Sequence, residues 1–224
     1  VHKNLKLIGI TGTKGKSTTA YFMRYILDDY LAAMGKPKSA VISSIDTYDG
    51  VVCEESHLTT PEALPLHMHY QNAVDSGIEY LTMEVSSQAL KYHRVLGVTF
   101  DIGCFLNIGT DHISDVEHKD FEDYFSSKLK LFRQCRTAVV NLNADKSDII
   151  LEEAKKYAER VVTFGLKEEA DVCGYDIVTA TDGISFKVRT KDFTEPFKIG
   201  IRGLFNVQNA LAAVAMSTVL GIPT

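Results

Sequence analysis

Residues 5–18 read LKLIGITGTKGKST and join an apolar, β-rich run to a turn with two glycines and the start of a helix. In this setting, backbone N–H groups and the helix N-terminus face a phosphate group, and the glycines allow its close approach. A lysine then neutralises the phosphate oxygens, and a following hydroxyl binds Mg²⁺. We therefore predict a phosphate-binding loop in which Lys16 contacts the phosphates and Ser17 holds the metal ion.

The loop departs from the strict G-x-x-x-x-G-K-[ST] pattern, because Ile10 stands where the first glycine belongs. The alternative interpretation is an ordinary glycine turn that Ser17 caps. Even as a phosphate site, the loop predicts only that a nucleoside triphosphate binds. It does not choose between a kinase, a GTPase, an ATPase and a ligase.

Outward from the loop, short apolar runs alternate with segments of helical periodicity. Near-continuous apolar runs are typical of strands in a parallel sheet that is covered on both faces. The alternation predicts an α/β fold: an open, mostly parallel sheet flanked by helices, similar to P-loop NTPases. The predicted strands are 5–10, 39–45, 78–85, 100–108, 137–142 and 161–164, and the predicted helices are 17–34, 61–76, 121–134 and 147–159.

The pattern changes after residue 170. Residues 172–179 and 184–189 flank Asp182-Gly183, a turn sequence typical of a β-hairpin, and 197–201 can add a third strand. We expect a parallel α/β core over 1–165, a small antiparallel sheet over 171–202 and a helix over 206–220. All three belong to one domain, 1–224, and both ends of the sequence look like cuts in a longer protein.

Composition excludes several classes of protein. The chain of 224 residues has a net charge of −5, so no basic face for nucleic acid is expected. No apolar run approaches the ~20 residues of a membrane span, and the N-terminus lacks a signal-peptide pattern. Four widely separated cysteines predict reduced thiols rather than a zinc site or a disulfide framework. We expect a cytosolic protein.

Two further side chains stand at predicted strand ends, where ligands gather in open α/β sheets. Glu84 ends strand 78–85, and His112 follows strand 100–108. A carboxylate and an imidazole there could both bind a metal ion on the phosphates. The alternatives are a solvated strand end for Glu84 and a capping or packing role for His112, and spacing alone does not decide between them.

Longer motifs resemble the Mur ligase family, and most closely its branch that adds the third amino acid of the cell-wall peptide. The loop TGTKGKST resembles the ATP loop of the family, which shares the departure at Ile10. The other matching stretches are TTPE (59–62), MEVSSQAL (83–90) with HR (93–94), NIGTDH (107–112), EH (117–118), FEDYF (121–125) with Lys128, and GLFNVQNAL (203–211).

The resemblance implies that a substrate carboxylate attacks the γ-phosphate of ATP, and that an amino group then displaces phosphate from the acyl phosphate. It implies two Mg²⁺ ions, held by Ser17, Glu84, His112 and Lys128, with Lys128 as a carbamate. The alternative for Lys128 is a surface lysine on a helix. The catalytic residues would be Lys16, Glu84, His112 and Lys128, and the ATP-binding residues Gly12, Thr13, Lys14, Gly15, Lys16, Ser17, Thr18, Asn206 and Asn209.

The same resemblance assigns Thr59, Thr60, Ser86 and Arg94 to the UDP-linked muramoyl dipeptide, to which L-lysine or meso-diaminopimelate would be added. It implies a monomeric, bacterial, cytoplasmic enzyme without nucleic-acid or membrane partners. A uridine-binding domain would precede these residues and an amino-acid-binding domain would follow them, so this fragment alone is expected to be inactive. The competing hypotheses are a folylpolyglutamate synthase-like ligase, a non-ligase P-loop nucleotide-binding protein and a non-catalytic paralogue.

Overall fold

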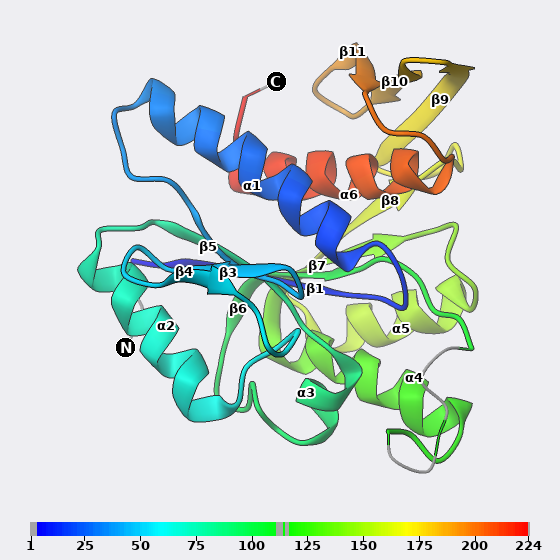
Figure 1. Ribbon diagram of the computed structural model, residues 1–224. Helices are drawn as coiled ribbons and strands as arrows, with labels where there is room; N and C mark the ends of the chain where they lie inside the picture. The colour runs from blue at the N-terminus through cyan, green and yellow to red at the C-terminus, as the bar shows by residue number, and fades with distance from the viewer. Residues whose placement is uncertain (1–3, 111–113, 115–116, 224) are drawn as a thin grey trace.

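The computed structural model describes residues 4–110, 114 and 117–223. In these residues, eleven strands form one sheet in the order β11-β10-β9-β8-β7-β6-β1-β5-β2-β3-β4. Helices cover both faces of the sheet (Figure 1). The predicted α/β class, with a mostly parallel sheet, is therefore confirmed.

The strands are β1 (Lys6–Thr11), β2 (Ala40–Ile42), β3 (Asp46–Tyr48), β4 (Cys53–Glu55), β5 (Tyr80–Glu84), β6 (Phe100–Phe105), β7 (Cys135–Asn141), β8 (Arg160–Gly165), β9 (Val172–Ala180), β10 (Gly183–Arg189) and β11 (Thr194–Ile199). The helices are α1 (Lys16–Ala33), α2 (Ala63–Asp75), α3 (Ser87–Lys91), α4 (Phe121–Leu129), α5 (Ser147–Tyr157) and α6 (Phe205–Leu220), with a 3₁₀ turn η1 (Lys130–Gln134) after α4.

The centre of the sheet places three strand ends together. β1 pairs in parallel with β5 on one side and β6 on the other. The register sets Ile10 opposite Glu84 and Thr11 opposite Phe105. The carboxyl ends of parallel strands meet at one edge, which is where open α/β sheets bind ligands.

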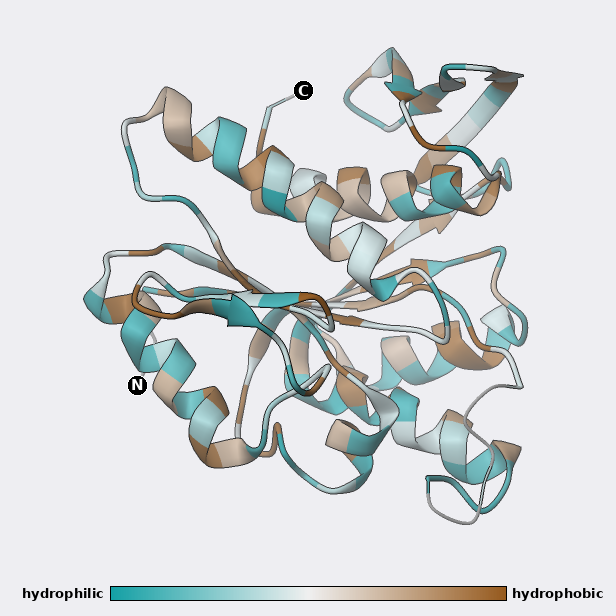
Figure 2. Cartoon of the chain, in the orientation of Figure 1, coloured by the Kyte–Doolittle hydropathy of each residue, from teal (hydrophilic) through white to brown (hydrophobic). Residues whose placement is uncertain are grey.

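Successive side chains of each strand point to opposite faces of the sheet, so the core is divided into two apolar layers. Leu7 packs in the layer with α2, α4 and α5, whereas Ile8 and Ile10 pack in the layer with α1 and α6. Figure 1 shows α1 and α6 above the sheet and α2 to α5 below it. Helix α2 carries teal and brown stretches side by side in Figure 2, which is typical of a helix that buries one face.

The structure corrects four details of the predicted elements. The strand predicted at 39–45 stops at Ile42, because the Ser43 hydroxyl accepts hydrogen bonds from the N–H groups of Ile45 and Asp46 and forms a turn. The next strands, β3 and β4, extend that edge antiparallel and were not predicted. Helix α3 was also missed, and β9 to β11 continue the main sheet through a short parallel pairing of β9 with β8.

Two predictions from composition can be compared with the described residues. The four cysteines are free thiols, as expected. In the described part of the chain, no helix combines the length and apolarity needed to cross a bilayer.

Asp49 ties the antiparallel edge to helix α2. Its side chain is fully buried and accepts hydrogen bonds from the backbone N–H groups of Val51 and Val52 and from the side chains of His69 and Asn72. Burial raises the pKa of Asp49, but the hydrogen bonds, led by the one from His69, outweigh burial and hold that pKa below its usual value.

We predict that Asp49→Ala lowers the free energy of unfolding by about 2–4 kcal/mol, because four donors lose a charged acceptor. Since the folded-state pKa is depressed, the carboxylate stabilises the fold above its unfolded pKa of about 4, and this contribution disappears as pH falls through the folded value. Denaturant unfolding at several pH values measures the effect. Asp182→Ala removes a solvent-exposed carboxylate paired with Lys198 and serves as the control. An equal decrease in the free energy of unfolding of both variants would contradict the prediction.

Candidate functional site

The glycine loop lies between the end of β1 and the start of α1, as predicted. Gly15 has a φ of 86° and precedes the first residue of α1, and a side chain there would collide with Asn209 of α6. Asn107, which follows β6, fixes the loop from the other side. Its carbonyl accepts from the N–H of Thr13 at 3.1 Å, and its side-chain oxygen accepts from the N–H of Lys14 at 2.9 Å. The loop is therefore held in place by side chains distant in sequence.

Two lysine amines converge on one carbonyl oxygen of this loop. Lys16 Nζ donates to Gly12 O at 2.9 Å, and Lys128 Nζ, from α4, donates to the same oxygen at 3.0 Å. Lys128 is 1% exposed, and its amine lies 4.7 Å from the ring centre of Tyr124. Because like charges repel, two cations this close favour an anion that contacts both.

Burial, and after it the Lys16 ammonium, lower the pKa of Lys128 well below its ordinary value. The pKa of Lys16 is also lowered by burial, although Glu84 acts in the opposite direction. A lowered pKa increases the fraction of neutral amine, which is the nucleophilic form of a lysine.

A group of oxygen atoms lies beside the first turn of α1. The Glu84 side chain, 1% exposed at the end of β5, accepts from Ser44 N at 2.8 Å and from Ser44 Oγ at 3.2 Å. Ser44 Oγ lies 3.0 Å from Ser17 Oγ. Carboxylate and hydroxyl oxygens are ligands that suit Mg²⁺, so these three side chains fit a magnesium site next to the phosphate loop.

A cavity of about 230 Å³, which we call the α3 cavity, opens on the side of the two amines. It is lined by Lys16, His57, Leu58, Thr59, Thr60, Ser86, Ser87, Gln88, Arg94, Glu117 and Lys128. The predicted substrate residues Thr59, Thr60, Ser86 and Arg94 thus share a wall with the two lysines.

Hydrogen bonds fix the shape of that wall. Thr60 Oγ1 donates to the carbonyl of Glu84 at 2.9 Å and accepts from the N–H of Ser86 at 3.0 Å. Arg94 donates to the carbonyl of Thr60 and pairs with Glu62 at 2.7 Å. Its buried Nε has no hydrogen-bond partner in the described residues.

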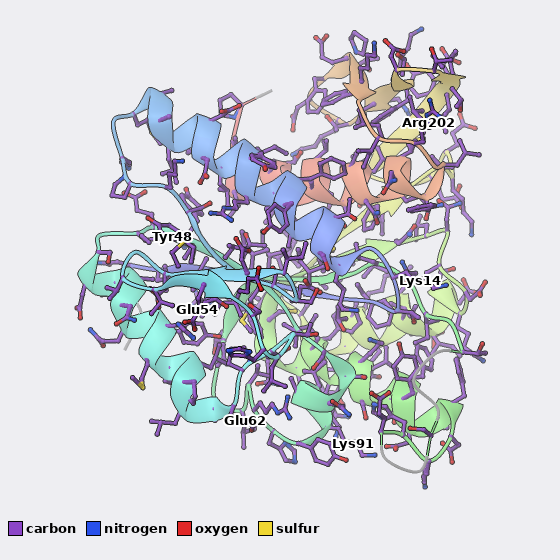
Figure 3. The ribbon with its side chains drawn as sticks, viewed as in Figure 1. Lys14, Tyr48, Glu54, Glu62, Lys91 and Arg202 are labelled. Atoms are coloured by element: carbon purple, nitrogen blue, oxygen red, sulfur yellow. The ribbon has the colours of Figure 1, made fainter. Side chains whose placement is uncertain are left out.

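Behind this cavity, His118 connects α3 with α4. Its Nε2 lies 2.9 Å from Ser87 Oγ, and its Nδ1 lies 3.4 Å from the Asp123 carboxylate, which Lys91 also contacts at 2.6 Å. In Figure 3, Glu62, just before α2, and Lys91, on α3, both lie below the sheet. The network holds α3 against α4, the helix that carries Lys128.

A second cavity of about 610 Å³, the α6 cavity, lies on the other side of the loop. Its lining combines loop residues, the ends of β6 to β8 and the start of α6: Thr13, Lys14, Gly15, Leu106, Asn107, Ile108, Gly109, Thr110, Asn141, Phe164, Phe205, Gln208 and Asn209. Figure 3 shows Lys14 on the loop and Arg202 ahead of α6, on the same side of the molecule. A phosphate on the loop would therefore leave the rest of a nucleotide facing the α6 cavity.

The structure places the remaining predicted residues as follows. Asn209 lines the α6 cavity, whereas Asn206 lies behind it and connects Asn209 to the carbonyl of Arg202. Thr18 lies in the first turn of α1 and is half-buried. His112 lies outside the described residues.

Several side chains of the site were not predicted. Ser44 follows a strand that ends early, and no motif marks it. Tyr124 bonds Thr13 Oγ1 at 2.9 Å, and Phe205 is 66% exposed although it is a large apolar side chain beside a cavity. Gln208 lies inside the stretch NVQN, so a functional role for the whole stretch could have been proposed.

Comparison with known proteins agrees with this geometry. The chain belongs to the Mur ligase family, whose middle-domain model matches residues 10–217. It is 39% identical over 222 residues to the UDP-N-acetylmuramoyl-L-alanyl-D-glutamate–L-lysine ligase of Enterococcus faecalis, covering 97% of this chain and 43% of that protein. It is 36% identical over 221 residues to the corresponding 2,6-diaminopimelate ligase of Clostridium perfringens, with 98% and 44% covered.

A solved structure of a UDP-N-acetylmuramoyl-L-alanyl-D-glutamate–2,6-diaminopimelate ligase superposes with a TM-score of 0.84 at 24% identity. The match covers 100% of this chain and 45% of the solved one. At 24% identity, this superposition shows a shared fold and nothing more. The chain spans less than half the length of the curated relatives it matches.

We predict that Lys128→Met raises the free energy of unfolding by about 1–2 kcal/mol near neutral pH, because a buried amine is replaced by an apolar side chain of similar length. The folded-state pKa of Lys128 is lowered, so between that value and 10.5 the unfolded chain binds more protons and wild-type stability rises with pH. The difference between the variant and the wild type should therefore shrink as pH rises.

Denaturant unfolding between pH 7 and 10 measures this difference. Lys36→Met serves as the control, since Lys36 lies on the surface and pairs with Glu79. A Lys128→Met protein with the stability and pH slope of the wild type would show that the Lys128 amine is hydrated and not desolvated.

Proposed function

We propose that the protein containing this chain is an ATP-dependent ligase of cell-wall peptide synthesis. It adds L-lysine or meso-diaminopimelate to UDP-N-acetylmuramoyl-L-alanyl-D-glutamate through an acyl phosphate. The observation that carries this proposal is the convergence of Lys16 and Lys128 on Gly12 O, between a cavity for the nucleotide and a cavity for the acceptor.

The α3 cavity supports the transfer step on the acceptor side. Arg94 lines this cavity, and its guanidinium supplies a donor for a carboxylate or phosphate of the acceptor, beside Thr59 and Thr60. An acceptor carboxylate in this cavity lies on the side of the loop where Lys16 and Lys128 meet. Its oxygen attacks the γ-phosphorus of ATP, and the bond from that phosphorus to the bridging oxygen of ADP breaks.

The Lys16 ammonium and the loop N–H groups stabilise the negative charge on the transferred phosphoryl group. Before the reaction, Gly12 O holds the Lys16 amine and Asn107 holds the loop, so these groups need little rearrangement. In the second step, the amino group of the incoming amino acid attacks the acyl carbon, phosphate leaves, and one proton is released.

Ser17, Ser44 and Glu84 would hold one Mg²⁺ ion. When bound, the ion neutralises charge on the phosphate oxygens of ATP. Lys128, as a carbamate, and His112 would hold the second ion. The neutral form of Lys128, which its lowered pKa favours, is the form that attacks CO₂, forming an N–C bond and losing a proton to give the carbamate.

The α6 cavity would receive the nucleoside of ATP. Asn209 lines it, and the exposed ring of Phe205 offers a face on which a base can stack. Asn206 supports Asn209 from behind.

The named relatives favour this proposal over a folylpolyglutamate synthase-like ligase and over a nucleotide switch, because both are named for adding an amino acid to the muramoyl dipeptide nucleotide. Relatives named for lysine and for diaminopimelate match to a similar degree, so the assay uses both amino acids. A monomeric cytoplasmic enzyme remains part of the proposal.

We predict that the full-length protein forms ADP from ATP only when the muramoyl dipeptide nucleotide is present, and that one of the two amino acids increases the rate. Lys16→Met should lower kcat/KM at least about 100-fold, since charge on the transferred phosphoryl loses its cation. A coupled ADP assay measures both. Lys36→Met, a distant surface change, should leave the rate unchanged. Steady ATP hydrolysis in the absence of the acceptor would contradict the ligase proposal.

Lys128→Ala should abolish turnover, and formate or acetate should restore part of it by supplying the missing carboxylate oxygens. The assay is repeated with wild type, where the same salts should have no stimulating effect. Turnover of the Ala variant at the wild-type rate would remove Lys128 from the site.

A further inference from the structure

Asn141 is buried at the end of β7, at the wall of the α6 cavity, and all its polar atoms are used. Its Nδ2 donates to the carbonyl of Leu106 and to Gln208 Oε1, both at 2.8 Å. Its Oδ1 accepts from the backbone N–H of Asn143 at 2.9 Å. Backbone groups cannot exchange donor for acceptor, so they fix which way the Asn141 amide faces.

The orientation of Asn141 determines that of Gln208. Asn141 presents a donor, so Gln208 must turn its oxygen toward it, and a flipped Gln208 would set two N–H groups against each other. The Gln208 NH₂ group is then turned away from Asn141. The Gln208 side chain is half-buried and lines the α6 cavity. No described residue accepts a hydrogen bond from the NH₂ group.

We propose that Gln208 is a base-reading residue of the nucleotide cavity and that Asn141 is the positioning residue that sets its orientation. Gln208 donates a hydrogen bond to a ring nitrogen of the adenine, and Asn141 prevents it from offering an acceptor instead. This inference rests on the proposed ATP site and adds the chemistry by which the base is recognised.

The lining of the cavity supports this assignment. Leu106, Ile108, Phe164 and Phe205 make much of the wall apolar, so a base can be held there by contact and stacking. In such a wall, a fixed donor discriminates strongly, because a ligand without the matching acceptor leaves it unpaired.

The test measures the affinity of the full-length protein for ATP and for 1-deaza-, 3-deaza- and 7-deaza-ATP by calorimetry. Each analogue replaces one ring nitrogen by C–H. We expect one analogue to bind wild type about tenfold more weakly than ATP, the size of one hydrogen bond. In Gln208→Met and Gln208→Glu, the Kd for the same analogue divided by the Kd for ATP should be near one.

Gln208→Glu keeps an oxygen for Asn141 while removing the donor, so it separates base reading from support of Asn141. Asn141→Asp should also bring the ratio of the two affinities near one, although Gln208 is intact. An aspartate at position 141 accepts a hydrogen bond from the Gln208 NH₂ group, so the Gln208 oxygen then faces the cavity. Thermal melts identify any variant that fails to fold. Gln71→Met, on the surface of α2, should keep the wild-type ratio.

The outcomes separate the two proposals. If wild type binds neither ATP nor the analogues, the proposed function fails and the base-reading role fails with it. If ATP binds but all three analogues bind equally well, or if the ratio persists in Gln208→Met and Gln208→Glu, only the role of Gln208 is overturned. If the ratio is lost in both Gln208 variants but kept in a folded Asn141→Asp, the positioning role of Asn141 is overturned.

Discussion

The carbonyl oxygen of Gly12 accepts hydrogen bonds from the amines of both Lys16 and Lys128, and it thereby holds the two amines close together. Two ammonium groups at such a site repel, and burial makes the charged forms more costly still. The fold tolerates this because the lysines come from helices on opposite faces of the sheet, each anchored in its own apolar layer. The surrounding structure therefore holds two amines close together although their charged forms repel.

The site is consequently divided by the sheet. The α6 cavity is lined by residues of α6, and the α3 cavity by residues of α3 and α4. Helix α6 lies on one face of the sheet, and α3 and α4 lie on the other (Figure 1). The glycine loop borders the α6 cavity through Thr13 to Gly15, and Lys16, the first residue of α1, borders the α3 cavity. Under the proposed function, the nucleotide and the acceptor would occupy separate cavities on the two sides of this segment.

Sequence predicted the parts of this arrangement that depend on local pattern. The loop, the central strands and the helices α1, α2 and α6 follow from apolar runs and glycine punctuation. Resemblance added Lys128 and Arg94, which the structure brings to one cavity wall. Ser44 could not be predicted, because it matters only through its contact with Glu84, 40 residues away. The orientation of Gln208 depends on Asn141, 67 residues away, and on backbone groups whose positions only the fold defines.

The close approach of Gly15 to Asn209 joins the first loop of the chain to its last helix. During synthesis, β1 and the glycine loop leave the ribosome long before α6 does, and domains complete their packing only when their last element is available. Until α6 emerges, Gly15 lacks Asn209 as a neighbour, and the α6 cavity has no wall at Phe205 and Gln208. The nascent chain therefore cannot gain stability from a nucleotide in that cavity. A ligand in the α6 cavity could therefore add stability only after α6 has been made.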